Sequence, residues 1–138
     1  MRPTLKKIID PVQSAFVRKQ FIHDNILLNY EIMNKFKNMK GKKSWVTLKL
    51  DIEKAYDIVE WAFLFETLKQ LGFHKIWIAW IKECVTTVSY SIIVNDEVCD
   101  FFSPIRGIRQ GDSFSAYLFI ICVEVLIRAL RKVQMNKK

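Results

Sequence analysis

Apolar residues recur with the period of a helix in four stretches of the chain. The four helices predicted in this way cover about 24–39, 58–70, 74–85 and 113–132. Asp24 can cap the first helix, and Gly72 follows the second where a C′ residue would stand. The apolar side of the first carries Ile26, Tyr30, Met33 and Phe36, and that of the third carries Ile76, Trp77, Trp80, Ile81 and Cys84. We expect Trp77 and Trp80 to pack in the core rather than to stack on bases, because they lie three residues apart.

Alternation of polar and apolar residues predicts strands in two places. At about 45–51, Val46, Leu48 and Leu50 share one face, and the polar face ends in the carboxylate of Asp51. Residues 88–94 and 98–102 flank a turn at residues 95–97, which predicts a β-hairpin. The order α, β, α, α, β, β, α predicts an α+β domain in which helices cover one face of an antiparallel sheet.

The chain has 138 residues, enough for one domain, and carries 22 basic against 14 acidic residues, a net charge of +8. This excess is compatible with a polyanionic partner and equally with a basic protein that has none. The three cysteines lack C-x-x-C spacing, so we expect buried thiols in a reducing, intracellular compartment. No secretory signal follows Met1. The longest apolar run, Phe114 to Ile127, is shorter than the roughly 20 residues of a membrane span, so we expect a buried helix.

Two segments contain residues that suggest a metal-binding or phosphate-binding site. In Leu48-Lys-Leu-Asp51-Ile-Glu-Lys-Ala-Tyr56-Asp57, a carboxylate is expected at a strand end beside exposed backbone carbonyls. Such a site suits Mg²⁺, which takes one or two carboxylates and fills its other positions with water and phosphate. The second segment, Arg106-Gly-Ile-Arg109-Gln110-Gly111-Asp112, is called the basic loop below, and an apolar helix follows it. Glycine allows close approach of a ligand to the backbone, and arginine matches phosphate geometry.

These segments resemble motifs A and B of reverse transcriptases. With Gln13-Ser-Ala-Phe16 and Asp24-Asn-Ile-Leu27 upstream and Leu71-Gly-Phe73 between them, they are most similar to the enzymes of LINE-type (non-LTR) retrotransposons, in particular those of plants. The resemblance runs from about Ile8 to about Leu130. It implies the fingers–palm part of an RNA-directed DNA polymerase. Its partners would be an RNA template, a DNA primer and deoxynucleoside triphosphates, and its location the nucleus.

The resemblance also implies roles for single residues. Asp51 would be the catalytic ligand of Mg²⁺ or Mn²⁺, with the backbone carbonyl of Ile52 beside it. The nucleotide would be contacted by Lys54, Ala55, Tyr56, Gln110 and Gly111, with the ring of Tyr56 as the steric gate under the sugar. Arg106 and Arg109 would touch phosphate or template. Two ordinary alternatives stay open: Tyr56 could pack in the core, and Lys54 could be a solvated lysine. Asp57 and Asp112 are expected to cap helices.

The chain departs from the family pattern in three places. Ser113-Phe114-Ser115-Ala116 stands where relatives usually have Pro-Leu-Ser-Pro, and Arg18-Lys19-Gln20 replaces Pro-Gly-Arg. Motif C should carry two adjacent aspartates, and no such pair occurs in the sequence. We therefore expect residues 1–138 to be a partial reverse transcriptase domain with motifs A and B but not C, inactive by itself. The alternative is a non-catalytic, nucleic-acid-binding remnant of such an enzyme.

Overall fold

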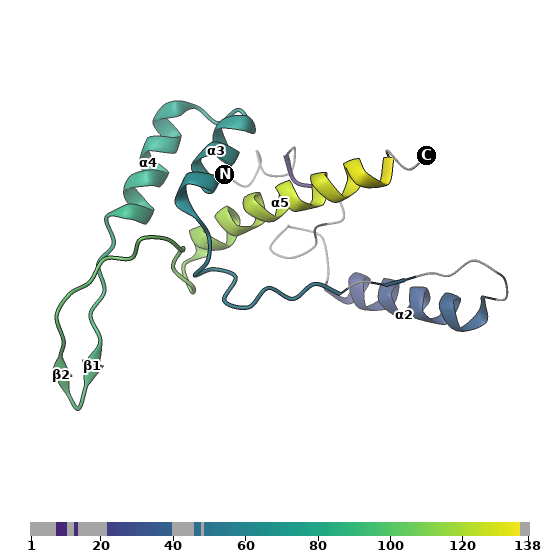
Figure 1. The fold of residues 1–138 in the computed structure, drawn as a ribbon, viewed down its shortest axis with the longest axis horizontal. Coiled ribbons are helices and arrows are strands. Elements are labelled where there is room, and N and C mark those ends of the chain that lie inside the picture. Colours follow the sequence, from purple (N-terminus) through teal and green to yellow (C-terminus); the bar gives the residue numbers. More distant parts are fainter. Residues whose placement is uncertain (1–7, 11–12, 14–21, 40–45, 48, 136–138) are drawn as a thin grey trace. The chain divides into compact units, whose positions relative to one another are not determined.

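The computed structural model describes residues 8–10, 13, 22–39, 46–47 and 49–135 (Figure 1). The chain forms two compact units, Met1–Glu53 and Lys54–Lys138, and each is described here by itself. Within the described residues there are four labelled helices and one two-stranded antiparallel sheet. The coarse α+β prediction therefore agrees with the structure.

The described part of the first unit consists mainly of one helix. This helix, α2, spans Ile22–Asn38, close to the predicted range. Asp24 lies inside its first turn rather than before it, so its charge suits the positive end of the helix dipole but it is not the cap. The expected apolar face is open to solvent, because Ile26, Tyr30 and Met33 are exposed.

The strand predicted at 45–51 is wrong for the residues that the structure describes. Val46, Thr47 and residues 49–51 lie outside any strand, and Val46 is 87% exposed. Trp45 and Leu48 fall outside the described residues. A strand needs a neighbour to satisfy its backbone groups. The described chain offers no β-pairing beyond the hairpin at 90–102, so the alternating pattern alone does not make a strand here.

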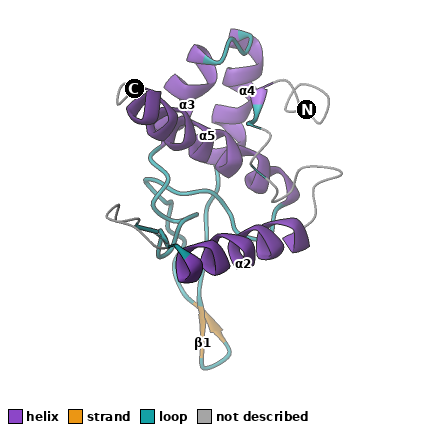
Figure 2. Ribbon diagram, turned by 90° about the vertical axis from the view of Figure 1, so that its right-hand side faces the viewer, coloured by secondary structure: helices purple, strands orange, loops and turns teal. Residues whose placement is uncertain are grey.

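Three helices build the core of the second unit. They are α3 (Trp61–Gln70), α4 (Lys75–Thr86) and α5 (Ser113–Met135), and α3 packs against both of the others (Figure 2). The largest fully buried side chains are Leu64, Leu68, Ile81, Leu118 and Ile121, with members on each helix. All three helices match the predicted ranges within three residues.

The connection between α3 and α4 follows from Gly72, as the sequence predicts. Gly72 has φ +81°, and its N–H donates to the carbonyl of Lys69 at 3.0 Å. The N–H of Phe73 donates to the carbonyl of Leu68 at 3.1 Å, which completes a Schellman C-cap. At the other end of α3 the N-cap residue is Glu60, so the prediction that Asp57 caps this helix is wrong.

Half-buried Trp77 packs as predicted. Its ring stacks on Phe73 at a centroid distance of 4.9 Å and meets the edge of Phe114 at 6.4 Å. Trp80 is 64% exposed, so core packing is wrong for that residue. Three residues are less than the roughly 3.6 of a full helical turn, so Trp80 points in a different direction from Trp77. Only the side of α4 that faces α3 is buried.

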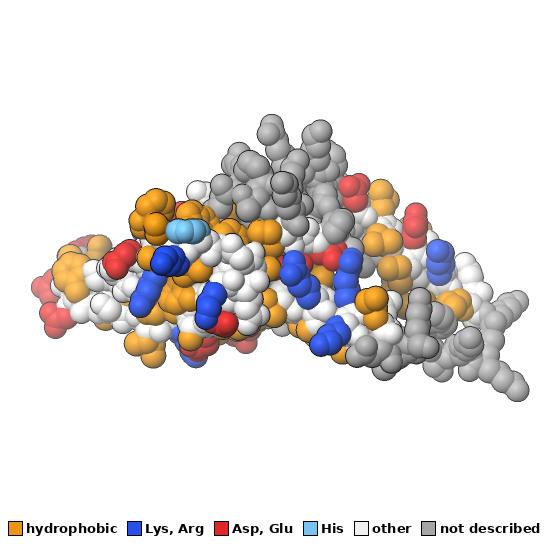
Figure 3. All heavy atoms as spheres, turned by 90° about the horizontal axis from the view of Figure 1, so that it is seen from above, with side chains coloured by type: hydrophobic (Ala, Val, Ile, Leu, Met, Phe, Trp, Pro, Cys, Tyr) orange, Lys and Arg blue, Asp and Glu red, His pale blue; other side chains and the backbone are white. Residues whose placement is uncertain are grey.

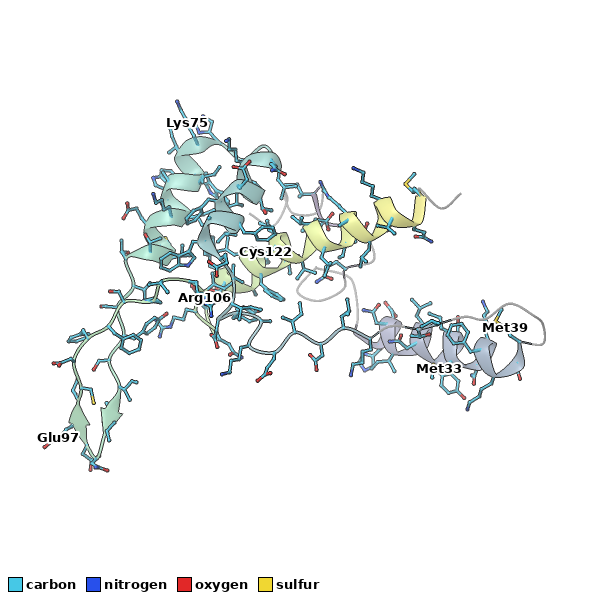
Figure 4. The ribbon with its side chains drawn as sticks, in the orientation of Figure 1. Met33, Met39, Lys75, Glu97, Arg106 and Cys122 are labelled. Carbon is cyan, nitrogen blue, oxygen red and sulfur yellow. The ribbon has the colours of Figure 1, made fainter. Side chains whose placement is uncertain are left out.

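The cysteines also differ from the expectation. Cys84 and Cys99 are exposed, so the prediction of buried thiols is wrong for both. Cys122 lies on α5 (Figure 4) and is half-buried. Burial raises the pKa of its thiol from the ordinary 9.0 to about 11.

The predicted hairpin forms, with shorter strands than expected. β1 (Ile93–Val94) pairs with β2 (Glu97–Val98), and an isolated bridge joins Tyr90 to Phe102. The turn residues Asn95 and Asp96 have φ of 51° and 64°, the pair of positive values that a type I′ turn needs. In the part of the chain described, no helix packs on these strands, so the predicted layer of helices over a sheet is wrong there. Both faces of the hairpin are solvated, because the opposed pair Ile93 and Val98 on one face and the pair Val94 and Glu97 on the other are all exposed.

Among the described helices, α5 alone is long and apolar enough to cross a membrane by length and composition. The core helix of a soluble protein meets the same criteria, and α5 packs on α3 with Leu118 and Ile121 fully buried. We therefore describe α5 as a core helix. The absence of a membrane partner stays a prediction.

Candidate functional site

The basic loop lies against a turn at residues 54–58, which contains the last residues of the segment 48–57, and backbone hydrogen bonds hold the two together. The N–H of Gly107 donates to the carbonyl of Val59 at 2.8 Å, and the N–H of Ile108 donates to the carbonyl of Tyr56 at 2.9 Å. Both segments belong to the second unit. Ile108 is buried. Two segments that the sequence separates by almost 50 residues therefore form one local structure.

Side chains from the start of α3 reinforce this contact. The Nε1–H of Trp61 donates to the carbonyl oxygen of Gly107 at 2.7 Å, across 46 residues of sequence. Arg106 Nη1 lies 3.3 Å from Glu60 Oε1. Both charged groups of this pair are exposed, so water and salt screen their attraction and the pair adds little. The short bond from Trp61 is the stronger of the two anchors.

Gly107 is required by the space available to it. Its φ is +91°, a conformation that L side chains rarely adopt. A β-carbon there would lie 2.9 Å from the backbone carbonyl oxygen of Asp57. The neighbouring atom is backbone and cannot turn away, so only glycine allows the basic loop to approach the turn this closely.

The turn itself is tight and places Tyr56 against α5. The N–H groups of Asp57 and Ile58 donate to the carbonyl of Lys54 at 2.9 and 3.2 Å, and Lys54 has φ +50°. The ring of half-buried Tyr56 stacks on Phe119 at 4.9 Å with an interplanar angle of 20°. Lys54 is exposed and Ala55 is half-buried. The ring of Tyr56 thus has a packing partner on α5.

Asp112 sets the direction in which the basic loop enters α5. Its Oδ1 accepts a hydrogen bond from the N–H of Phe114 at 3.0 Å, so the predicted cap is confirmed. This cap fixes the first turn of α5, where Ser113 and Ala116 stand in place of the prolines that are usual in the family. Gly111 has φ +93°, and a β-carbon there would meet nothing within 4 Å. Arg109, Gln110 and Gly111 are exposed, with their side chains or backbone available to a ligand.

An open cleft of about 630 Å³ lies where the basic loop meets the end of α4 and the base of the hairpin. Its polar lining comes from Asp57, Arg106, Arg109, Gln110, Asp112 and Ser115. Its apolar lining includes Val85, Val88, Tyr90, Phe102 and Phe114. Figure 4 shows Arg106 beside the first turn of α5. Guanidinium groups bind phosphate and aromatic walls accept planar rings, so this lining suits a ligand that has both.

The structure brings only some of the predicted site residues together in the cleft. Gln110, Arg106 and Arg109 line the cleft, whereas Lys54, Ala55, Tyr56 and Gly111 are not among its lining residues. Asp51 and Ile52 are exposed and belong to the first unit, whereas the basic loop belongs to the second. Figure 3 shows Lys and Arg side chains reaching the surface among apolar ones.

The donor chemistry at Asp51 fits Mg²⁺ in part. A carboxylate and the neighbouring carbonyl of Ile52 are both hard oxygen donors, and Mg²⁺ can complete its shell with water and phosphate. In the described chain, no group of three or more His, Cys, Asp or Glu side chains could hold a metal ion. Asp51 can therefore supply one protein ligand there.

The sequence interpretation missed Trp61. The residue starts α3 and holds the basic loop, yet its place in the sequence suggests only a helix residue. A signal did exist, because an indole N–H that is partly buried usually finds an acceptor. The sequence does not show which carbonyl that acceptor would be.

Comparison with known proteins gives concordant results. The family model described as reverse transcriptase (RNA-dependent DNA polymerase) matches residues 1–137. An uncharacterized 149 kDa protein of transposon TX1 from Xenopus laevis is 29% identical over 132 residues, 96% of this chain and 10% of that protein. The Pol polyprotein of the type-2 retrotransposable element R2DM from Drosophila melanogaster is 26% identical over 121 residues, 88% of this chain and 11% of that protein.

A shorter match concerns an uncharacterized mitochondrial protein of Arabidopsis thaliana. It is 48% identical over 42 residues, 30% of this chain and 34% of that protein. No solved structure matches the chain. The chain spans about a tenth of the length of the transposon TX1 and R2DM proteins.

Proposed function

Because the chain belongs to the reverse transcriptase family, we propose that it supplies the nucleotide-binding part of an RNA-directed DNA polymerase of a non-LTR retrotransposon. The reaction adds deoxynucleotides to a DNA 3′ end under the direction of an RNA template. The hydrogen bond from the N–H of Ile108 to the carbonyl of Tyr56, at 2.9 Å, supports this proposal best. It joins the two segments that carry the expected nucleotide contacts. In this proposal, the chain contributes fingers and palm elements to that enzyme.

The basic loop would bind the triphosphate and base. Arg106 and Arg109 line the cleft and would pair with phosphate oxygens, which guanidinium groups match with two parallel hydrogen bonds. Gln110 would contact the nucleotide through its amide, and Gly111 would let the backbone come close. Lys54 and Ala55 would flank the triphosphate from the turn.

Tyr56 would select the sugar. Its ring is held by the stack on Phe119, so a 2′-hydroxyl that met the ring could not push it aside easily. Deoxynucleotides lack that group. The same stack is the core packing that the sequence left open, and the two interpretations are compatible because a packed ring makes a rigid gate.

Asp51 and the carbonyl of Ile52 would hold Mg²⁺, with Mn²⁺ as a substitute. When bound, the metal would supply the positive charge that nucleotidyl transfer of this kind requires. Asp51 is exposed and so able to meet a hydrated ion. We place the protein inside the cell, with the nucleus as the expected location of such an enzyme.

Nucleotide binding by the purified chain tests the proposal. We expect a labelled deoxynucleoside triphosphate with Mg²⁺ to bind, and Arg109→Ala and Gln110→Ala to weaken binding about tenfold or more, since bonds to charged groups are the strong ones. Lys75→Ala is the matched control, because this lysine lies at the start of α4 and away from the cleft lining (Figure 4). Absence of binding, or equal losses in Lys75→Ala and Arg109→Ala, would contradict the proposal.

The net charge of +8 favours a second candidate, a non-catalytic domain that binds RNA or an RNA–DNA duplex. Phosphate contacts release counterions, so affinity would fall steeply with salt and depend little on sequence. Binding isotherms for an RNA–DNA duplex at several salt concentrations test this. A flat salt response, or no binding at low salt, would remove this candidate. Duplex binding without any nucleotide binding would favour it over the first.

A further inference from the structure

We propose that Trp61 is a positioning residue: its indole N–H holds the carbonyl of Gly107 and thereby fixes the basic loop in its nucleotide-binding position. The loop contact is observed, whereas its effect on nucleotides rests on the function proposed above. In this proposal Trp61 does not touch the nucleotide, because its one hydrogen-bond donor is used by the carbonyl of Gly107. It would act through the backbone of the loop.

The anchor is short and comes from a rigid element. Nε1 of Trp61 lies 2.7 Å from the carbonyl oxygen of Gly107. Trp61 is the first residue of α3, and the same helix is fixed in the core by the fully buried Leu64 and Leu68. An indole has a single donor, so this bond uses all of its hydrogen-bonding capacity.

Three hydrogen bonds then meet on two consecutive residues of the loop. The carbonyl of Gly107 accepts from Trp61, its N–H donates to Val59, and the N–H of Ile108 donates to Tyr56. Movement of the loop away from the turn would break all three together. Arg106 directly precedes Gly107, and the exposed residues 109–111 follow Ile108; both stretches carry proposed contacts. The anchor therefore fixes the part of the loop that lies between the proposed ligand contacts.

Trp61→Phe removes the donor and keeps an aromatic ring. Gly107 is itself only partly exposed, so its carbonyl loses a partner that water replaces incompletely. We expect hydrogen exchange at the amides of Gly107 and Ile108 to rise about fivefold to tenfold, the effect of one lost hydrogen bond. The dissociation constant for the deoxynucleoside triphosphate should rise by a similar factor. Trp80→Phe is the matched control, because Trp80 is 64% exposed and lies on α4.

The readouts separate positioning from a general structural role. In the Trp61→Phe protein, exchange in the buried part of α5, at Leu118 and Ile121, should stay within about twofold of wild type. A rise in exchange in α5 as large as that in the loop would overturn the inference, and so would equal loop exchange in Trp61→Phe and Trp80→Phe. If Trp61→Phe does not fold, the wild-type protein still gives a test, because the indole N–H of Trp61 should exchange more slowly than that of Trp80.

A failure of the positioning role and a failure of the proposed function give different experimental results. If Arg109→Ala weakens nucleotide binding and Trp61→Phe leaves it unchanged, the positioning role is wrong and the proposed function stands. If the wild-type protein binds no nucleotide, the proposed function fails, and the nucleotide-positioning role fails with it even where loop exchange confirms the anchor.

Discussion

Gly107 lies so close to Asp57 that a β-carbon on Gly107 would be 2.9 Å from the backbone carbonyl oxygen of Asp57. This contact sets the distance between the basic loop and the turn that contains Tyr56. Because both partners are backbone atoms, neither can move without displacing its segment. A side chain added at Gly107 should therefore destabilise the second unit.

We predict that Gly107→Ala lowers the free energy of unfolding more than the same change at the other glycines with positive φ. Gly72 and Gly111 have φ of +81° and +93°, and a β-carbon on either would meet nothing within 4 Å. Those two variants should lose about 1–2 kcal/mol from backbone conformation alone. Gly107→Ala adds a clash and should lose about 1–3 kcal/mol more, or displace the loop.

Urea unfolding of the three variants measures these differences. The controls share the chemistry of the substitution and nearly the same φ, so only the clash distinguishes Gly107. Equal losses at Gly107 and Gly111 would show that the turn and the loop are not in contact in solution.

A second prediction concerns the helix cap at Asp112. Asp112→Ala should lower the free energy of unfolding by about 0.5–2 kcal/mol, because the N–H of Phe114 loses its acceptor. Asp112→Asn keeps an acceptor oxygen and should retain most of the stability. Chemical unfolding followed by circular dichroism measures both. Identical losses in the two variants would mean that the charge of Asp112, and not the cap, provides the stabilisation.

The sequence predicts the helices and the hairpin well because their signals are local. Gly72 ends α3, Asp112 begins α5, and the pair Asn95–Asp96 turns the hairpin, each through the conformation of one or two residues. The failures are non-local. The alternating pattern around Asp51 gives no strand in the described residues, because a strand depends on a partner elsewhere in the chain. Exposure of Trp80 and Cys84 likewise depends on which side of α4 faces α3.

In the candidate site, too, the local features could be predicted from the sequence and the contacts between distant residues could not. The sequence indicates the basic loop and the turn at Tyr56 separately, from residue types and spacing. Their contact depends on Gly107, on the bond from Trp61 and on the stack of Tyr56 on Phe119. None of these pairings has a short sequence separation, so only the folded structure reveals them.

A third prediction uses the thiol of Cys122. Burial raises its pKa to about 11 from an ordinary value of 9.0, so the folded state keeps the proton at pH values where the unfolded state releases it. The unfolded state then binds fewer protons, and stability falls as pH rises from about 9 to 11. The contribution is complete below pH 9 and is lost as pH rises through the folded pKa. Its slope is at most about 1.4 kcal/mol per pH unit, the value for one proton.

Urea midpoints at pH 8 and pH 10.5 measure this effect, with Cys122→Ala as the reference. Other groups titrate in the same range, and subtracting the Cys122→Ala result removes their contribution. We expect wild type to lose more stability than Cys122→Ala between the two pH values. Parallel losses would show that the thiol of Cys122 is accessible to water in solution.

The last prediction is that the 138-residue chain does not extend a DNA primer on an RNA template. Nucleotidyl transfer by two metal ions about 3.5–4 Å apart needs carboxylates that hold both ions in line with the attacking and leaving oxygens. Asp51 can supply one such group, and the sequence contains no adjacent aspartate pair to supply the others. Asp112 is occupied as a helix cap, and Glu60 pairs with Arg106.

Primer extension with deoxynucleotides and Mg²⁺ measures this directly, with Asp51→Ala as the matched variant. We expect no product from either protein, even at concentrations where nucleotide binding is complete. Extension by the wild-type chain that disappears in Asp51→Ala would contradict the prediction. It would also show that Asp51 does bind catalytic metal, with the remaining carboxylates recruited from elsewhere, for instance from a second copy of the chain.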